Sequence, residues 1–102
     1  MKIVHQNLAN GSWQKLSLYE QMGNIGSEVG RVARARDEIS RQKAFERALE
    51  LFDLTAGDPK RAHQLKEILR ARELFVQEAL ERNDLSDFDK YFMNFAIAAR
   101  SR

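Results

Sequence analysis

A chain of 102 residues can build one hydrophobic core but is too short for two domains. Its 17 basic and 15 acidic residues leave a net charge of +2, which neither demands nor excludes a nucleic-acid partner. The absence of cysteine excludes disulfides and thiolate-bound metals. No apolar run is long enough for a signal peptide or a membrane span, so we expect a cytoplasmic protein without a membrane partner.

Five glycines and a single proline are typical of a helical chain. We predict an all-α fold, an antiparallel up-and-down four-helix bundle that forms one domain over residues 1–102. A short N-terminal arm covers residues 1–16. The predicted helices cover about 18–36, 41–55, 59–82 and 87–100.

The N-terminal arm contains an Asn10-Gly11-Ser12 turn signal, and we expect the following Trp13 to pack back on the bundle. Ser17 and Glu20 have the spacing of a capping box, which starts the first helix. Apolar residues then recur at steps of four and three, which predicts a seam facing the core. They are Leu18, Met22, Ile25, Val29 and Val32.

Three glycines, Gly23, Gly26 and Gly30, lie on one flank of this predicted helix. Each costs about 1 kcal/mol relative to alanine in a helix interior. Their shared flank indicates either close approach of a neighbouring helix or a shallow cleft in which a ligand or partner lies against the backbone.

Asp37 or Ser40 can cap the second helix, and Gly57 suits the left-handed residue that ends it. Asp58-Pro59 then begins a third helix with no glycine or proline before Asn83, which we expect to be the long axis of the fold. Its expected core stripe is Ala62, Leu65, Leu69, Val76 and Leu80, widened by Ile68, Phe75 and Ala79.

Arg72 falls in the middle of that apolar stripe. A buried guanidinium is costly unless a carboxylate meets it, so we predict a buried ion pair that fixes helix register. The candidate carboxylates are Glu28, Glu46, Glu50 and Asp53. Snorkelling to the surface and an anion clamp are the alternatives.

The last helix carries apolar groups on two sides, because Met93 and Ile97 lie opposite its main aromatic stripe. Such a helix needs a second cover, either the N-terminal arm with Trp13 or another copy of the chain. Met93 and Ile97 are therefore the candidate oligomer face.

Basic residues cluster in two stretches: one contains Arg31, Arg34, Arg36, Arg41 and Lys43, and the other contains Lys60, Arg61, Lys66 and Arg70. If the ends of the helices bring the two stretches together, Arg31, Arg34, Lys66 and Arg70 form a candidate basic patch. The alternative is a solvated surface balanced by acidic residues. No aromatic residues that would stack on bases are interleaved with them.

The sequence shows no phosphate-binding loop, nucleophile elbow or Glu-x-x-His motif. We therefore predict no catalytic residue, metal or cofactor. Glu50-Leu-Phe-Asp53 resembles the Glu-x-x-Asp half of the all-α nucleotide pyrophosphohydrolases, which bind magnesium through four carboxylates. The other half departs from that pattern, because Arg31 stands three residues after Glu28 where the family has a second glutamate.

Three stretches, 13–31, 44–55 and 91–100, resemble a group of small prokaryotic helical proteins, a likeness that brings no activity to this chain. The architecture is also similar to the four-helix proteins encoded in 23S rRNA intervening sequences and to the accessory bundles of diversity-generating retroelements. That second likeness implies oligomers with a basic surface for nucleic acid and reverse transcriptase.

These observations favour a non-enzymatic interaction module that self-associates or binds a helical protein partner. The alternative function is a nucleic-acid-binding accessory protein that uses the basic patch. A magnesium-dependent pyrophosphohydrolase-like enzyme is the third, weakened by Arg31.

Overall fold

The computed structural model describes residues 11–82, 84–85, 88 and 90–92. Over this part of the chain every regular element is helical: η2 (Trp13–Lys15), α1 (Leu18–Arg34), α2 (Glu38–Ala56), η3 (Pro59–Gln64) and α3 (Leu65–Leu80). The all-α prediction is thus confirmed. The fourth helix predicted at 87–100 lies mostly outside the described residues, although 88 and 90–92 are helical. No helix among those described has the length and apolar character needed to cross a membrane.

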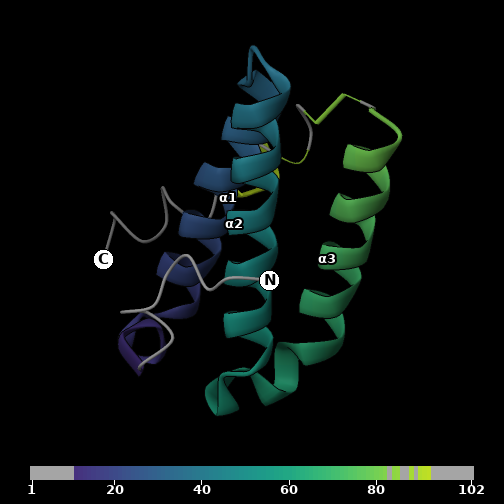
Figure 1. Ribbon diagram of the computed structural model, residues 1–102. Helices are drawn as coiled ribbons and strands as arrows, with labels where there is room; N and C mark the ends of the chain where they lie inside the picture. Colours follow the sequence, from purple (N-terminus) through teal and green to yellow (C-terminus); the bar gives the residue numbers. More distant parts are fainter. Residues whose placement is uncertain (1–10, 83, 86–87, 89, 93–102) are drawn as a thin grey trace.

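Helices α1 and α2 lie side by side and antiparallel, joined by a short turn (Figure 1). The predicted capping box starts α1: the Ser17 hydroxyl accepts from the Glu20 amide at 3.1 Å, and the Glu20 carboxylate accepts from the Ser17 amide at 2.9 Å. Of the two caps considered for α2, Asp37 fills the role, because its carboxylate accepts from the Ser40 amide at 2.7 Å.

The central helix is α2, which packs against α1 on one side and α3 on the other (Figure 1). The expectation that the third helix is the long axis is therefore wrong. Phe75 of α3 reaches the core through Phe45 and Phe52 of α2, with ring centroids 5.5 and 5.8 Å apart. These aromatic contacts set how α3 is rotated.

The helix predicted from 59 to 82 is broken near its start. Arg61, with φ −101° and ψ 16°, interrupts the 3-10 turns of η3, and Gln64, with φ −103° and ψ 2°, separates η3 from α3. Asp58 caps η3 by accepting from the Lys60 amide at 3.0 Å. Gly57 has φ −83°, so the expected left-handed conformation is wrong there. Arg82 takes that conformation after α3, with φ 59°.

The core stripe predicted for α3 is also wrong in its orientation. Ile68, Phe75 and Ala79 face the core, whereas Leu65, Leu69 and Leu80 are exposed. The two sets lie on adjacent arcs of one helix, and a single neighbouring helix covers only one of them.

Arg41 of α2 ties the C-terminal ends of the other two helices together. Its guanidinium donates to the carbonyl of Val32 in α1 at 3.2 Å and to that of Ala79 in α3 at 2.8 Å. Carbonyls in a last helical turn have no partner within the helix, so a cation there satisfies both hydrogen bonding and the helix dipole.

Candidate functional site

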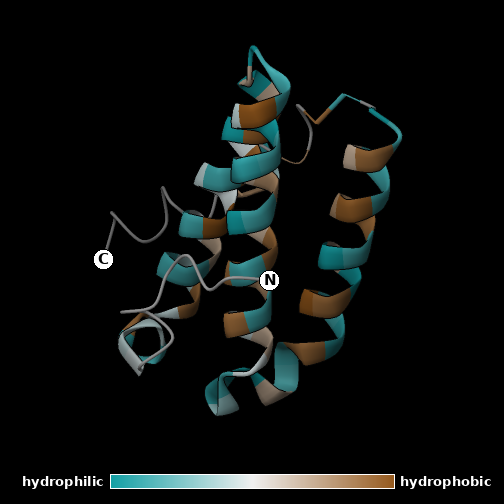
Figure 2. Ribbon diagram, in the orientation of Figure 1, coloured by the Kyte–Doolittle hydropathy of each residue, from teal (hydrophilic) through white to brown (hydrophobic). Residues whose placement is uncertain are grey.

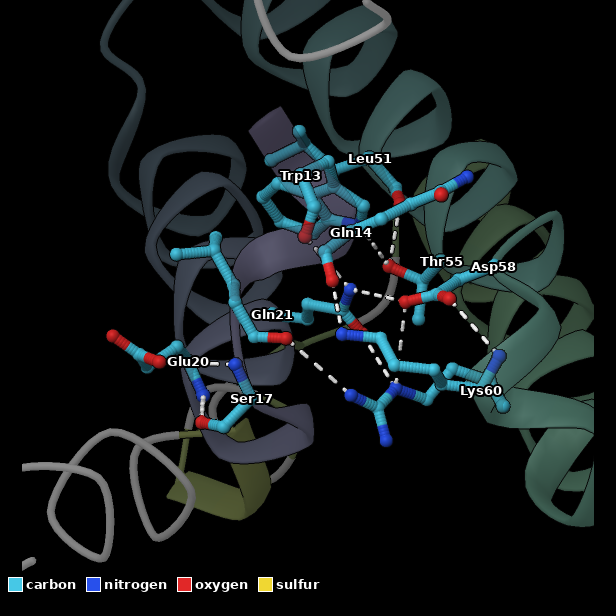
Figure 3. Close-up of polar contacts among 11 residues, drawn as sticks. Trp13, Gln14, Ser17, Glu20, Gln21, Leu51, Thr55, Asp58 and Lys60 are labelled. Carbon is cyan, nitrogen blue, oxygen red and sulfur yellow. Dashed lines mark hydrogen bonds and ion pairs between the residues drawn. The ribbon is translucent and has the colours of Figure 1, made fainter. Parts of the chain in front are cut away.

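A buried polar network joins η2, α1, α2 and η3 at the end of the molecule opposite the α1–α2 turn (Figures 1 and 3). The Trp13 indole donates to the Thr55 hydroxyl at 2.9 Å, and that hydroxyl donates to the Leu51 carbonyl at 2.8 Å. Trp13 and Thr55 are buried, so the predicted packing of Trp13 on the bundle is confirmed.

Gln21 is the hub of this network. Its amide nitrogen donates to the Trp13 carbonyl at 3.0 Å and to the Asp58 carboxylate at 2.9 Å. Its amide oxygen accepts from Arg61 at 2.9 Å. Both polar atoms of this buried side chain are bonded within the protein, so Gln21 has a structural role.

Asp58 remains charged in this buried position because donors and cations surround it. Burial raises the pKa of its carboxyl, but hydrogen bonds from the Gln21 side chain and the Lys60 amide, with the charges of Lys60 and Arg61, outweigh that effect and leave the pKa below 3.8. The Lys60 ammonium also donates to the Gln14 carbonyl, which holds η2 against η3.

Arg72 pairs with one of the four predicted carboxylates, Asp53, at 2.9 Å. The pair is not buried, however, because its side chains are 33% and 55% exposed. The prediction of a buried Arg72 ion pair is wrong, since α3 is rotated so that this arginine lies at the edge of its contact with α2. Glu46 accepts instead from Gln42 at 3.3 Å, and Glu50 is buried in α2.

Glu28 is a buried carboxylate that lies on α1. Arg31 donates to one of its oxygens at 2.6 Å, and Arg47 of α2 lies 4.0 Å from the other, which accepts no hydrogen bond within the described structure. Glu28 therefore meets Arg31 and Arg47 rather than the predicted Arg72.

The glycine flank packs against the chain's own later segment. A Cβ added to Gly26 would lie 3.3 Å from both the Cα and the carbonyl carbon of Phe92. Of the two interpretations of this flank, close packing is the one found at Gly26. Gly30 is also buried and Gly23 is half-buried.

The exposed leucines of α3 form an apolar surface that sequence analysis assigned to the core. We call Leu65, Leu69 and Leu80 the leucine stripe; they are 38%, 46% and 71% exposed. Figure 2 shows hydrophobic residues along the length of α3. Helical spacing places the half-buried Val76 on the same arc.

A hollow of about 330 Å³ lies on another side of α3. Its lining is Glu67, Arg70, Ala71, Leu74, Phe88 and Tyr91. Burial raises the pKa of Tyr91, and the negative charge of Glu67 raises it further.

A second hollow, of about 500 Å³, lies at the α1–α2 turn, and five cationic side chains line it. We call it the cationic hollow; its basic residues are Arg31, Arg34, Arg36, Lys43 and Arg47. Two residues of the predicted basic patch, Arg31 and Arg34, belong to it. The other two do not, because Lys66 and Arg70 lie on the first half of α3, at the far end of the molecule from this turn (Figure 1).

Neither the polar network nor the contribution of Arg47 to the cationic hollow was predicted from the sequence. Helical spacing could have indicated Arg47, which follows Lys43 by four residues. Nothing in the sequence pairs Gln21 with Asp58, because 37 residues separate them. The predicted oligomer face of Met93 and Ile97 lies outside the described residues.

Among the described residues, no three acidic or histidine side chains gather as metal ligands would. The two glutamate positions carried by the pyrophosphohydrolase resemblance, Glu28 and Glu50, are buried, and Glu28 is bonded to Arg31. Comparison of the chain with family models, curated proteins and solved structures found no significant match.

Proposed function

We propose that this protein is a non-enzymatic interaction module that self-associates through the leucine stripe of α3. The observation that carries the proposal is the exposure of Leu65, Leu69 and Leu80 along one side of a single helix. Scattered exposed leucines are ordinary, but leucines aligned at helical spacing are typical of a helix face that packs against a partner.

The charges beside the stripe support a second copy of this chain as the partner. Helical spacing places Lys66 and Glu73 along one border, while Arg72, paired with Asp53, lies on the other. An isologous interface brings the same patch of two copies together, and a patch with both signs of charge can satisfy its own charges. A partner whose surface carried charges of only one sign would repel those groups beside the stripe that have the same sign.

This proposal assigns the contact to α3 rather than to the glycine flank. Phe92 already lies against Gly26, so at that position the flank is occupied by the chain itself. We also propose that the last predicted helix completes an up-and-down four-helix bundle, supported by the helical residues 90–92 beside α1. Met93 and Ile97 remain a predicted second contact within the same assembly.

The test compares two leucines of α3 with similar exposure. Leu69 is 46% exposed on the stripe, and Leu74 is 43% exposed on the other side of the helix. Burying a half-exposed leucine contributes about 1 kcal/mol per copy. A symmetric dimer that loses this leucine from both copies should therefore have a dissociation constant roughly 30-fold higher. Sedimentation equilibrium should show this increase for Leu69→Gln, and no change for Leu74→Gln.

A strict monomer at millimolar concentration would contradict the proposal. Equal weakening by Leu69→Gln and Leu74→Gln would do the same, because it would place the interface elsewhere on α3. Thermal unfolding at a concentration where every variant is monomeric controls for loss of fold, and we expect little change since both side chains already contact water.

A further inference from the structure

The cationic hollow concentrates positive charge far beyond the composition of the chain. Five of the nine residues that line it are basic and one, Asp37, is acidic, whereas the whole chain has nearly equal numbers, 17 basic and 15 acidic. The lining therefore concentrates positively charged side chains at one turn.

Asp37 and Glu28, two described carboxylates at the hollow, already interact with other groups of the protein. Asp37 accepts from the amide and the hydroxyl of Ser40, at 2.7 and 3.1 Å. These hydrogen bonds lower the pKa of Asp37, and the charge of Lys43 lowers it further, so the cap stays ionised. Glu28 offsets Arg31 through the 2.6 Å ion pair. Arg36 and Lys43, both exposed at the rim, are the side chains best placed to meet a ligand.

The position of the hollow also favours an anion. It includes Asp37 and Ser40 at the start of α2, where the helix dipole adds partial positive charge to that of the side chains. Arg31 and Arg34 lie on α1, Lys43 and Arg47 lie on α2, and Arg36 lies in the turn between them. Cations spread over two helices and a turn suit several phosphates in series better than a single carboxylate.

We propose that the cationic hollow binds the phosphodiester backbone of a nucleic-acid duplex without reading its base sequence. The lining has no aromatic side chain among the described residues, so it provides no surface on which unpaired bases would stack. Contacts to phosphates alone give affinity that depends on salt but not on sequence. This binding uses the α1–α2 turn, and it does not rest on self-association through α3.

The experiment measures binding of a fluorescent 20-base-pair duplex to the full chain by anisotropy over a range of salt concentrations. The test variant is Arg36→Gln with Lys43→Gln. The matched control, Lys15→Gln with Arg70→Gln, removes the same charge from η2 and α3, away from the hollow and from the leucine stripe. We expect the test variant to bind at least tenfold more weakly at low salt, with a salt slope reduced by about two, and the control to stay within twofold of the wild type.

A third variant makes the opposite change at the same place. Glu28→Gln keeps the shape of a buried side chain but removes the negative charge that holds Arg31. It should bind the duplex several-fold more tightly, a gain that a damaged fold would not produce.

Three results would overturn the proposal. One is the absence of duplex binding at low salt, where phosphate contacts are strongest. Another is equal weakening by the test and control variants, which would indicate diffuse charge rather than this hollow. The third is equal affinity for polyglutamate, which would show attraction to any polyanion. We expect similar affinities for DNA and RNA duplexes and a weaker affinity for a single strand, because the lining provides contacts to phosphates and no aromatic side chain among the described residues.

Discussion

At the scale of single residues, Gln21 has a structural role that its sequence context does not indicate. A lone glutamine near the start of an amphipathic helix is ordinary, yet this one contacts segments 8, 37 and 40 residues away along the chain. Its amide is both donor and acceptor, so it can bridge the Asp58 carboxylate and the Arg61 guanidinium without adding a charge of its own.

Replacing Gln21 with methionine keeps the volume of the side chain but removes its hydrogen bonds. Asp58, which is 2% exposed, then loses a donor and Arg61 loses an acceptor. We expect the free energy of unfolding to fall by about 2–4 kcal/mol, because a buried charged group is left short of partners. Urea unfolding measures this change.

The matched control is Gln42→Met, since Gln42 is exposed and makes one long hydrogen bond to Glu46. It should change the free energy of unfolding by less than about 0.5 kcal/mol. Similar losses for the two variants would contradict a special role for Gln21.

At the scale of elements, α3 shows how two apolar arcs on one helix compete for a single neighbour. Its leucine stripe satisfies the spacing rule for a core face as well as the buried arc of Ile68, Phe75 and Ala79 does. Phe75 decides the orientation, because its ring fits between the two phenylalanines of α2. Periodicity alone therefore identifies an amphipathic helix but not which arc is covered.

Gly26 of α1 lies directly against Phe92. Alanine at this position should improve the intrinsic helix propensity of α1 by about 1 kcal/mol. The added methyl group would nevertheless meet the backbone of Phe92 at 3.3 Å and its Cβ closer still, so the later segment must shift. We expect Gly26→Ala to lower the free energy of unfolding by a net 1–3 kcal/mol.

Ser27→Ala on the same helix is the control, because Ser27 is exposed and bonds only to the preceding turn, at the Gly23 carbonyl. Thermal unfolding should show little loss, or a small gain, for this variant. Stabilisation by Gly26→Ala would mean that Phe92 does not lie against α1 in solution.

At the scale of the whole molecule, two groups of charged and polar residues lie at opposite ends. Arg41 and the cationic hollow lie at the α1–α2 turn, and the network around Asp58 lies at the opposite end (Figures 1 and 3). The network around Asp58 makes the stability of the fold depend on pH, because the hydrogen bonds and ion pairs of this buried carboxylate require its ionised form.

The pKa of Asp58 is lower in the folded chain than its ordinary value of 3.8. Its contribution to stability is therefore complete above the unfolded pKa, and it is lost as the pH falls through the folded pKa. We expect the free energy of unfolding to decrease as the pH drops from about 5 to about 2. Urea titrations at several pH values measure this dependence.

In Asp58→Asn the acid-dependent loss should be smaller than in the wild type, even if the variant is less stable at neutral pH. Part of the dependence will persist, because hydrogen bonds also lower the pKa of Glu20 and Asp37 at the helix starts. Parallel pH profiles for the wild type and Asp58→Asn would show that Asp58 does not carry the effect.

The sequence by itself determined the helical class, the start of α1 and the seam of α1, because these follow from hydrogen bonds and spacings within one turn of helix. For α2 it left two caps open, and the structure selected Asp37. The sequence also named Arg31 and Arg34 of the cationic hollow and the Asp53 partner of Arg72. Local rules are sufficient for a feature when the residues that determine it lie only a few positions apart in the sequence.

Only the tertiary structure decided that α2 is central, that α3 exposes its leucines, and that Gln21 meets Asp58 and Arg61. It also separated Lys66 and Arg70 from the cations of the α1–α2 turn. Each of these outcomes depends on how helices rotate and pack against one another. That choice is set by the fit of a few large side chains over long sequence separations, which no local pattern encodes.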